Sequence, residues 1–174
     1  MAESKKQIYK VVINAPIEKV WSELVNTTSP RPFFYGAVCD TPGLAPGAPY
    51  RMISKDGKNV FVVGEVTEFD PPHRYAHTFK FTTTDDAPCM VTYTLKEIEG
   101  GVEFCLITEN VPVGTKTEKS MASGGKWITE NLKKYVETGK PTFGAQMMLG
   151  MISLMSGMAP KLTRQENWPL GKHQ

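Results

Sequence analysis

The chain of 174 residues carries a formal net charge of +2, and 40% of its residues are hydrophobic, which suits one domain with a sizeable core. Lysines and arginines are interspersed with acidic residues, so no nucleic-acid-binding patch is predicted. The three cysteines (Cys39, Cys89 and Cys105) form no closely spaced pair, and a lysine pair rather than an apolar leader precedes the first strand. These features predict free thiols, no secretory signal and a cytoplasmic location.

The first part of the chain combines a strand, helical segments and an aromatic loop. Alternating apolar residues predict a strand over residues 7–13. Asn14 can cap a helix that starts at Pro16, and apolar residues recur on one face of residues 17–25. The proline- and glycine-rich stretch 27–49 contains Phe33, Phe34 and Tyr35, which are expected to pack over a cavity mouth. Two short helices are expected in this part.

Residues 50–108 have the pattern of an antiparallel meander. Alternation and turn-forming pairs such as Asp56-Gly57 predict strands over 50–54, 60–69, 73–81, 90–98 and 102–108. With the first strand they make a curved sheet of about six strands. Phe69 is out of step with Val62 and Val66, and a β-bulge would reconcile these positions.

Residues 124–141 form the most informative segment, because they have the pattern of a long amphipathic helix. Gly139 supplies a left-handed C-cap, and Pro141 prevents continuation. Residues 112–123 are assigned to a polar link that precedes this helix. The fold class is therefore α+β, with a curved antiparallel sheet around a long helix whose apolar face consists of Trp127, Ile128, Leu132, Tyr135 and Val136.

Several segments together resemble the START-like (SRPBCC) superfamily, and more narrowly the branch built around the C-terminal domain of heat-shock-protein ATPase activators. They are residues 15–21, 47–51 and 64–74, and the tryptophan-bearing helix that ends in Glu137-Thr138-Gly139. The resemblance covers roughly residues 6–141 and implies a helix-grip fold with a sheet-lined apolar pocket. It implies no single activity, since relatives bind lipids, cyclise polyketides or regulate a chaperone. Residues 1–141 are expected to form this domain, and residues 142–174 a C-terminal extension.

The function we expect first is non-catalytic binding of a small hydrophobic or lipid-like ligand between the sheet and the long helix. In this interpretation His77, Tyr93 and Arg51 supply the few polar contacts, and the aromatic loop is a lid. The candidate ligand-binding residues are Phe33, Phe34, Tyr35, Arg51, Val66, Tyr75, His77, Phe79, Tyr93, Phe104, Leu106, Trp127, Asn131 and Tyr135.

Each polar candidate also has an ordinary structural explanation. His77 could be a hydrogen-bonded core histidine, and Arg51 a solvated strand residue. Two other functions stay open: a cyclase- or hydrolase-like enzyme that uses His77 or Tyr93, and a chaperone regulator that uses its outer surface. His73, His77 and His173 are too scattered for a metal site, and no catalytic residue or cofactor is assigned.

The C-terminal extension has its own pattern. A helix there would carry a methionine stripe on one side (Met147, Met151, Met155, Met158) and small residues on another (Gly150, Ser153, Gly157). We expect this helix to pack on its own domain or to form a homodimer interface. Membrane contact is not expected, although Lys140, Lys161 and Arg164 would suit it, and the stretch is too polar to span a bilayer. Residues 161–170 should be extended, with Trp168 docked back.

Overall fold

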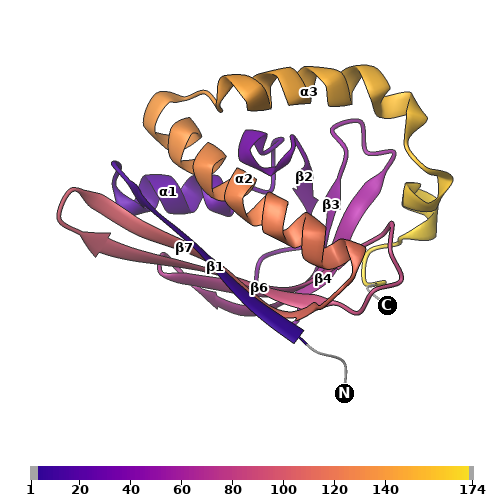
Figure 1. Ribbon diagram of the computed structural model, residues 1–174, viewed down its shortest axis with the longest axis horizontal. Coiled ribbons are helices and arrows are strands. Elements are labelled where there is room, and N and C mark those ends of the chain that lie inside the picture. Colours follow the sequence, from indigo (N-terminus) through magenta and orange to yellow (C-terminus); the bar gives the residue numbers. More distant parts are fainter. Residues whose placement is uncertain (1–3, 173–174) are drawn as a thin grey trace.

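The computed structural model describes residues 4–172, so residues 1–3 and 173–174, His173 among them, lie outside the described part. One antiparallel sheet of seven strands has the order β1-β7-β6-β5-β4-β3-β2. The sheet curves around the long helix α2 (Lys116–Thr138), which crosses its concave face diagonally (Figure 1). The α+β helix-grip architecture is thereby confirmed. The strands are β1 (Ser4–Ile13), β2 (Val38–Asp40), β3 (Pro49–Ile53), β4 (Val60–Asp70), β5 (Arg74–Phe81), β6 (Cys89–Ile98) and β7 (Gly101–Pro112).

The inner face of the sheet follows the predicted alternation. Val91, Tyr93 and Leu95 of β6 are all buried, and so is every second residue of β7 from Val102 to Thr108. The predicted bulge is present in β4, because the register with β5 shifts between Val66 and Glu68. One extra residue at this point lets Phe69 pack against the same core as Val62 and Val66 in spite of their uneven spacing, while Val60 and Val63 contact Trp168 in a separate cluster.

The segment between β1 and β3 differs in detail from the expectation. One α-helix, α1 (Ile17–Leu24), is followed by a single 3-10 turn, η1 (Pro32–Phe34), in place of a second helix. The short strand β2 was not predicted, since three residues within a proline-rich stretch show no alternation. It adds one strand to the sheet, and it buries Cys39.

Helix α2 starts eight residues earlier than the sequence pattern indicated, at Lys116 rather than at Gly124. Thr115 caps it, because its hydroxyl accepts a hydrogen bond from the backbone N–H of Glu118 at 3.2 Å. The Glu118 carboxylate in turn accepts from the N–H of Gly114 at 2.8 Å. Residues 116–123 are therefore helical, and Gly124-Gly125 lies in the middle of the helix.

The C-terminal extension forms a strap that is fixed at both ends. Helix α3 (Phe143–Met155) begins where Asn131 of α2 accepts hydrogen bonds from the N–H and hydroxyl of Thr142, at 3.0 and 2.9 Å. After α3, Thr163 is buried and donates to Asn59 at 2.9 Å. Trp168 docks back as predicted, against Val60 and other residues of the sheet. The segment before it has two 3-10 turns, η3 (Lys161–Thr163) and η4 (Gln165–Asn167), rather than an extended form; a third, η2 (Ser156–Met158), follows α3.

Candidate ligand cavity

An apolar cavity of about 450 Å³ lies between the sheet and the first half of α2. This volume is within the range of about 300–1,000 Å³ that is usual for small-molecule sites. The sheet supplies its floor, and α2 supplies its roof. The lining residues are Phe34, Tyr35, Ala37, Phe61, Val62, Phe79, Phe81, Thr83, Val91, Tyr93, Leu106, Thr108, Ser120, Met121, Ser123, Gly124, Gly125, Ile128 and Ile152.

The position of the cavity under α2 follows from side-chain size. The first half of the helix presents Gly124, Gly125 and two serines to the lining, and these leave space above the sheet. The second half presents the fully buried Leu132 and Val136, which fill it. Four of the lining residues (Thr83, Ser120, Ser123 and Ile152) are exposed, so the cavity reaches the surface among them.

Among the described residues that line the cavity, none is charged and none is a histidine or a cysteine. Its polar atoms are hydroxyls and backbone groups. Burial raises the pKa of Tyr93 to about 12, while the nearby Arg31 opposes this rise. Tyr93 is therefore neutral at pH 7, and within residues 4–172 its hydroxyl forms no hydrogen bond. The cavity thus offers apolar contact together with a free hydroxyl donor.

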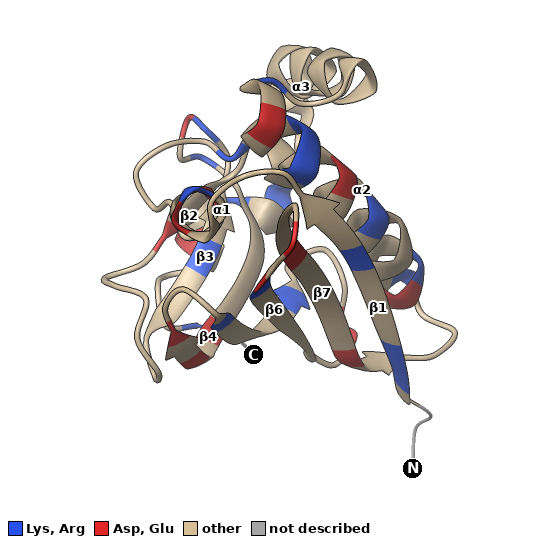
Figure 2. Ribbon diagram, turned by 90° about the vertical axis from the view of Figure 1, so that its left-hand side faces the viewer, with Lys and Arg blue, Asp and Glu red and all other residues tan. Residues whose placement is uncertain are grey.

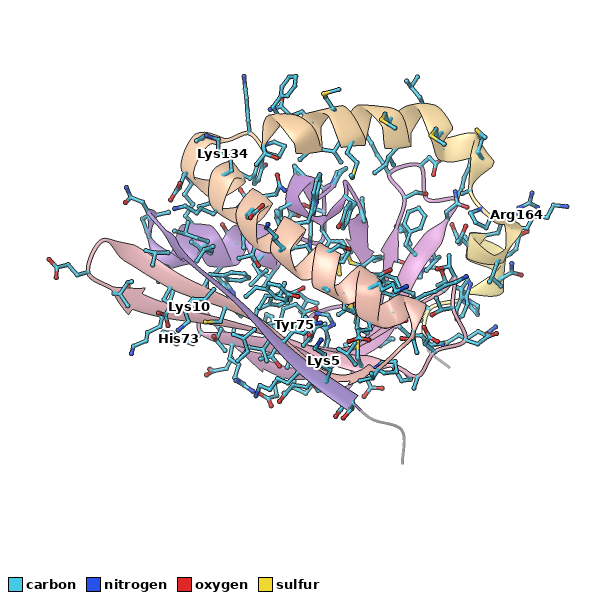
Figure 3. The ribbon with its side chains drawn as sticks, viewed as in Figure 1. Lys5, Lys10, His73, Tyr75, Lys134 and Arg164 are labelled. Carbon is cyan, nitrogen blue, oxygen red and sulfur yellow. The ribbon has the colours of Figure 1, made fainter. Side chains whose placement is uncertain are left out.

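Aromatic side chains fill the interior beside the cavity. The rings of Tyr75 and His77 lie 5.0 Å apart, and both lie 5.6 Å from Tyr93. Tyr75, labelled in Figure 3, sits over the sheet beneath α2 and is 2% exposed. Burial raises its pKa. Strand β5 thus contributes Tyr75 and His77 to the aromatic cluster, and Phe79 and Phe81 to the lining of the cavity.

His77 is buried in this cluster and is held by its neighbours. The Tyr50 hydroxyl lies 2.8 Å from Nδ1 of His77 and donates to the carbonyl oxygen of Thr78 at 2.7 Å. Burial is the main cause that lowers the pKa of His77 to about 4; the Thr78 carbonyl opposes this shift and the charge of Arg31 adds to it. His77 is thus a neutral, hydrogen-bonded core histidine that does not line the cavity.

Arg31 is the functional candidate that the sequence did not single out. It is only 5% exposed, its Nε donates to the Asn26 carbonyl at 2.7 Å, and its Nη2 has no hydrogen-bond partner in the described chain. Its charge acts on Tyr93, Tyr75 and His77. Within residues 4–172 this buried arginine has no carboxylate partner, so its charge makes the interior near Tyr93 electropositive. No sequence signal marks it, since Ser-Pro-Arg-Pro resembles an ordinary loop.

Tyr35 covers one side of the cavity in an unusual backbone conformation. It has a φ of 52° in the left-handed region, which non-glycine residues adopt at a cost. Its ring stacks on Trp127 with centroids 5.2 Å apart and an interplanar angle of 4°. The expectation of an aromatic loop over the cavity matches the position of Phe34 and Tyr35, which both contribute to the lining.

Of the fourteen candidates, five line the cavity: Phe34, Tyr35, Phe79, Tyr93 and Leu106. The others occupy four different environments. Core or cluster positions hold Phe33, Val66, Tyr75, His77 and Phe104, while Trp127 and Tyr135 pack at the edge of the core. Asn131 anchors α3, as described above. Arg51 pairs with Asp40 and donates to the Trp168 carbonyl at 2.9 Å, beside a separate polar hollow under the C-terminal strap.

A curved antiparallel sheet closed by one long helix over an apolar cavity defines a helix-grip protein. The chain belongs to the family described as "Activator of Hsp90 ATPase homolog 1-like protein", which matches residues 14–137. Helix α3 lies beyond the matched part. Among curated proteins, none is similar enough to the chain to count as a relative.

Solved structures show the same fold. Protein ChR145 from Cytophaga hutchinsonii is 26% identical, with a TM-score of 0.60, and the match covers 80% of this chain and 97% of that one. CalU16 from Micromonospora echinospora is 16% identical, with a TM-score of 0.60 and coverage of 85% and 83%. The Aha1 dimer from Colwellia psychrerythraea is 15% identical, with a TM-score of 0.61 and coverage of 78% and 98%.

Proposed function

We propose that the protein binds one small apolar ligand in the cavity between the sheet and α2, without changing it chemically. The observation that carries this proposal is the lining, which encloses about 450 Å³ and contains no charged residue, histidine or cysteine among the described residues. General acid–base catalysis is most effective when the pKa of the catalytic group lies near the working pH. The titratable side chains of the lining are tyrosines, and burial raises the pKa of Tyr93 to about 12. The cavity is suited to binding instead.

The ligand chemistry follows from the few polar groups around the cavity. Among the described residues the Tyr93 hydroxyl has no hydrogen-bond partner, and burial, which raises its pKa to about 12, keeps it protonated as a donor. Such a donor within an apolar cavity favours a ligand with an aromatic or aliphatic body and one acceptor oxygen, such as a carbonyl. The three free cysteines fit a reducing compartment, so we expect the protein to act in the cytoplasm.

A role as a chaperone regulator rests on the family description alone. The relative from Colwellia psychrerythraea is described as a dimer, and a homodimer of this chain is the assembly that the likeness suggests. Neither idea is needed to explain the cavity, and the experiment below tests ligand binding separately from both.

Val91 allows a direct test, because it is 2% exposed and lies on the floor of the cavity. Val91→Phe places a ring in the empty volume, and we expect it to weaken binding of the neutral fluorophore N-phenyl-1-naphthylamine by about tenfold or more, equivalent to ~1.4 kcal/mol. Val91→Ala at the same position enlarges the space and should retain binding. Fluorescence titration measures both affinities. Equal affinities of the two variants would contradict ligand binding in this cavity.

A further inference from the structure

The outward face of α3 is an apolar surface that the described chain leaves uncovered. On the opposite face Ala145 is fully buried, Leu149 touches Gly36, and Ile152 lines the cavity. A helix that is apolar on all sides is normally buried on all sides. The outward residues, which we call the α3 apolar face, are instead exposed, with Leu154 at 88%, Phe143 at 77% and Met158 at 76%: Phe143, Met147, Met151, Leu154, Met155 and Met158.

This exposure is built into the fold. Asn131 fixes the start of α3, and Thr163 and Trp168 fix the chain beyond its end. The helix therefore cannot turn its outer face inward without breaking these contacts. Three glycines of α3 and η2 (Gly144, Gly150 and Gly157) have nothing within 4 Å of their Cβ positions, so the surface around the apolar face is also open.

The charge distribution around α3 indicates what covers this face. Residues 141–160 contain no charged side chain, and α3 is drawn without blue or red in Figure 2. Exposed cations lie at both ends: Lys134 and Lys140 before the helix, and Lys161 and Arg164 after it. Lys134 and Arg164 mark these two ends in Figure 3. From residue 134 onward the chain has five lysines and arginines but two acidic residues, Glu137 and Glu166.

A second copy of the chain fits this charge distribution poorly. In an antiparallel pairing of two α3 helices, Lys140 of one copy would approach Lys161 and Arg164 of the other. In a parallel pairing each cation would approach its own counterpart. Like charges brought together across an interface oppose association. An anionic lipid surface, by contrast, attracts the cations at both ends while its acyl chains take up the apolar side chains between them.

We propose that α3 docks the protein on anionic lipid bilayers, with the α3 apolar face in the interfacial layer and the flanking cations at the headgroups. No described helix is long and apolar enough to cross a membrane. In this proposal the 13 residues of α3 therefore lie along the surface of the bilayer. This changes the expectation from sequence, which could not show that the outer face stays uncovered. Because Ile152 is on the other side of the same helix, docking places the cavity next to the lipid.

Co-sedimentation of the full chain with vesicles tests this proposal. We expect binding to phosphatidylcholine vesicles that contain phosphatidylglycerol, and much weaker binding to phosphatidylcholine alone. Leu154→Glu should reduce binding by about tenfold or more, because it places a charge on the α3 apolar face where that face would enter the lipid. Ile8→Glu makes the same kind of change at a residue of β1 that is 57% exposed, and it should bind like the wild type. Lys140→Glu combined with Lys161→Glu should remove the preference for anionic lipid.

Two results would overturn the proposal. One is wild-type protein that does not sediment with either vesicle type. The other is a wild-type dimer in analytical ultracentrifugation that Leu154→Glu converts to monomer while vesicle binding is unchanged, which would identify the face as a subunit interface. Circular dichroism of each variant verifies that it is folded. These measurements are independent of the fluorophore titration with Val91 variants, so docking and cavity binding can each fail separately.

Discussion

Gly125→Ala is expected to destabilise the protein by about 1–3 kcal/mol, the usual result of overpacking. An added Cβ would lie only 2.3, 2.6 and 2.8 Å from three carbons of the Tyr9 ring. That ring cannot easily move, because the Tyr9 hydroxyl donates to the Ala122 carbonyl of α2 at 3.1 Å. The helix must therefore move away from β1. Urea unfolding measures the loss.

Gly124→Ala is the matched control in the same turn of α2. The nearest atom to its Cβ is the Tyr35 hydroxyl, at an ordinary distance of 3.8 Å. Replacing glycine by alanine within a helix then contributes up to ~1 kcal/mol of stability, because alanine has the higher helix propensity. The adjacent substitutions should thus have opposite signs. Equal effects would show that α2 does not approach β1 as closely as described.

His77 is expected to make the stability depend on pH. Its pKa of about 4 in the folded protein is below the ordinary value of 6.5, so between these pH values the unfolded chain binds more protons. Its contribution is complete above pH 6.5 and is lost as the pH falls toward 4, by about 3 kcal/mol in total. His77→Phe should remove this part of the pH dependence, as measured by urea unfolding at several pH values.

The comparison must separate His77 from other groups that titrate in acid. Hydrogen bonds lower the pKa of several carboxyls, such as Glu118 and Glu137, and these act in wild type and variant alike. The difference between the two proteins therefore isolates the histidine. His73→Phe, the same replacement at an exposed histidine, controls for the loss of one such residue. A His77→Phe protein with the pH profile of the wild type would refute the burial of a neutral imidazole.

The sheet could be predicted from sequence because alternation is local information. Successive side chains of a strand alternate between the two faces of the sheet, so Tyr93 and Leu106 point to the helix side and their neighbours Thr92 and Cys105 to the other. The bulge in β4 was also indicated, because Phe69 is out of step with the residues before it. The strand β2 gave no such signal, since three residues are too few to show a period. Its pairing with β3 depends on contacts formed by the folded chain.

From sequence we expected Trp127, Asn131 and Tyr135 to line the cavity, whereas it lies under an earlier part of α2. The reason is that residues 116–123 were assigned to a link and not to the helix. Gly124-Gly125 resembled a helix boundary, whereas in the fold Gly125 lies within α2 and allows its close approach to Tyr9. The correct signal was present as Thr115 followed three residues later by Glu118, a capping pair. With the helix begun at Lys116, small residues rather than Trp127 and Tyr135 lie over the open part of the sheet. Arg31 and Ile152 could not be found this way, because only the tertiary fold brings them to the interior and to the cavity.

The most direct test of the account is native mass spectrometry of gently isolated protein, followed by denaturing extraction of whatever is bound. We expect a single apolar molecule per chain in the wild type, and clearly less of it in the Val91→Phe variant, whose larger side chain takes up part of the cavity. A wild type and a variant that both carry the same molecule in the same amount would contradict the account, because the ligand would then lie outside the cavity. So would a wild type that is empty and does not take up N-phenyl-1-naphthylamine.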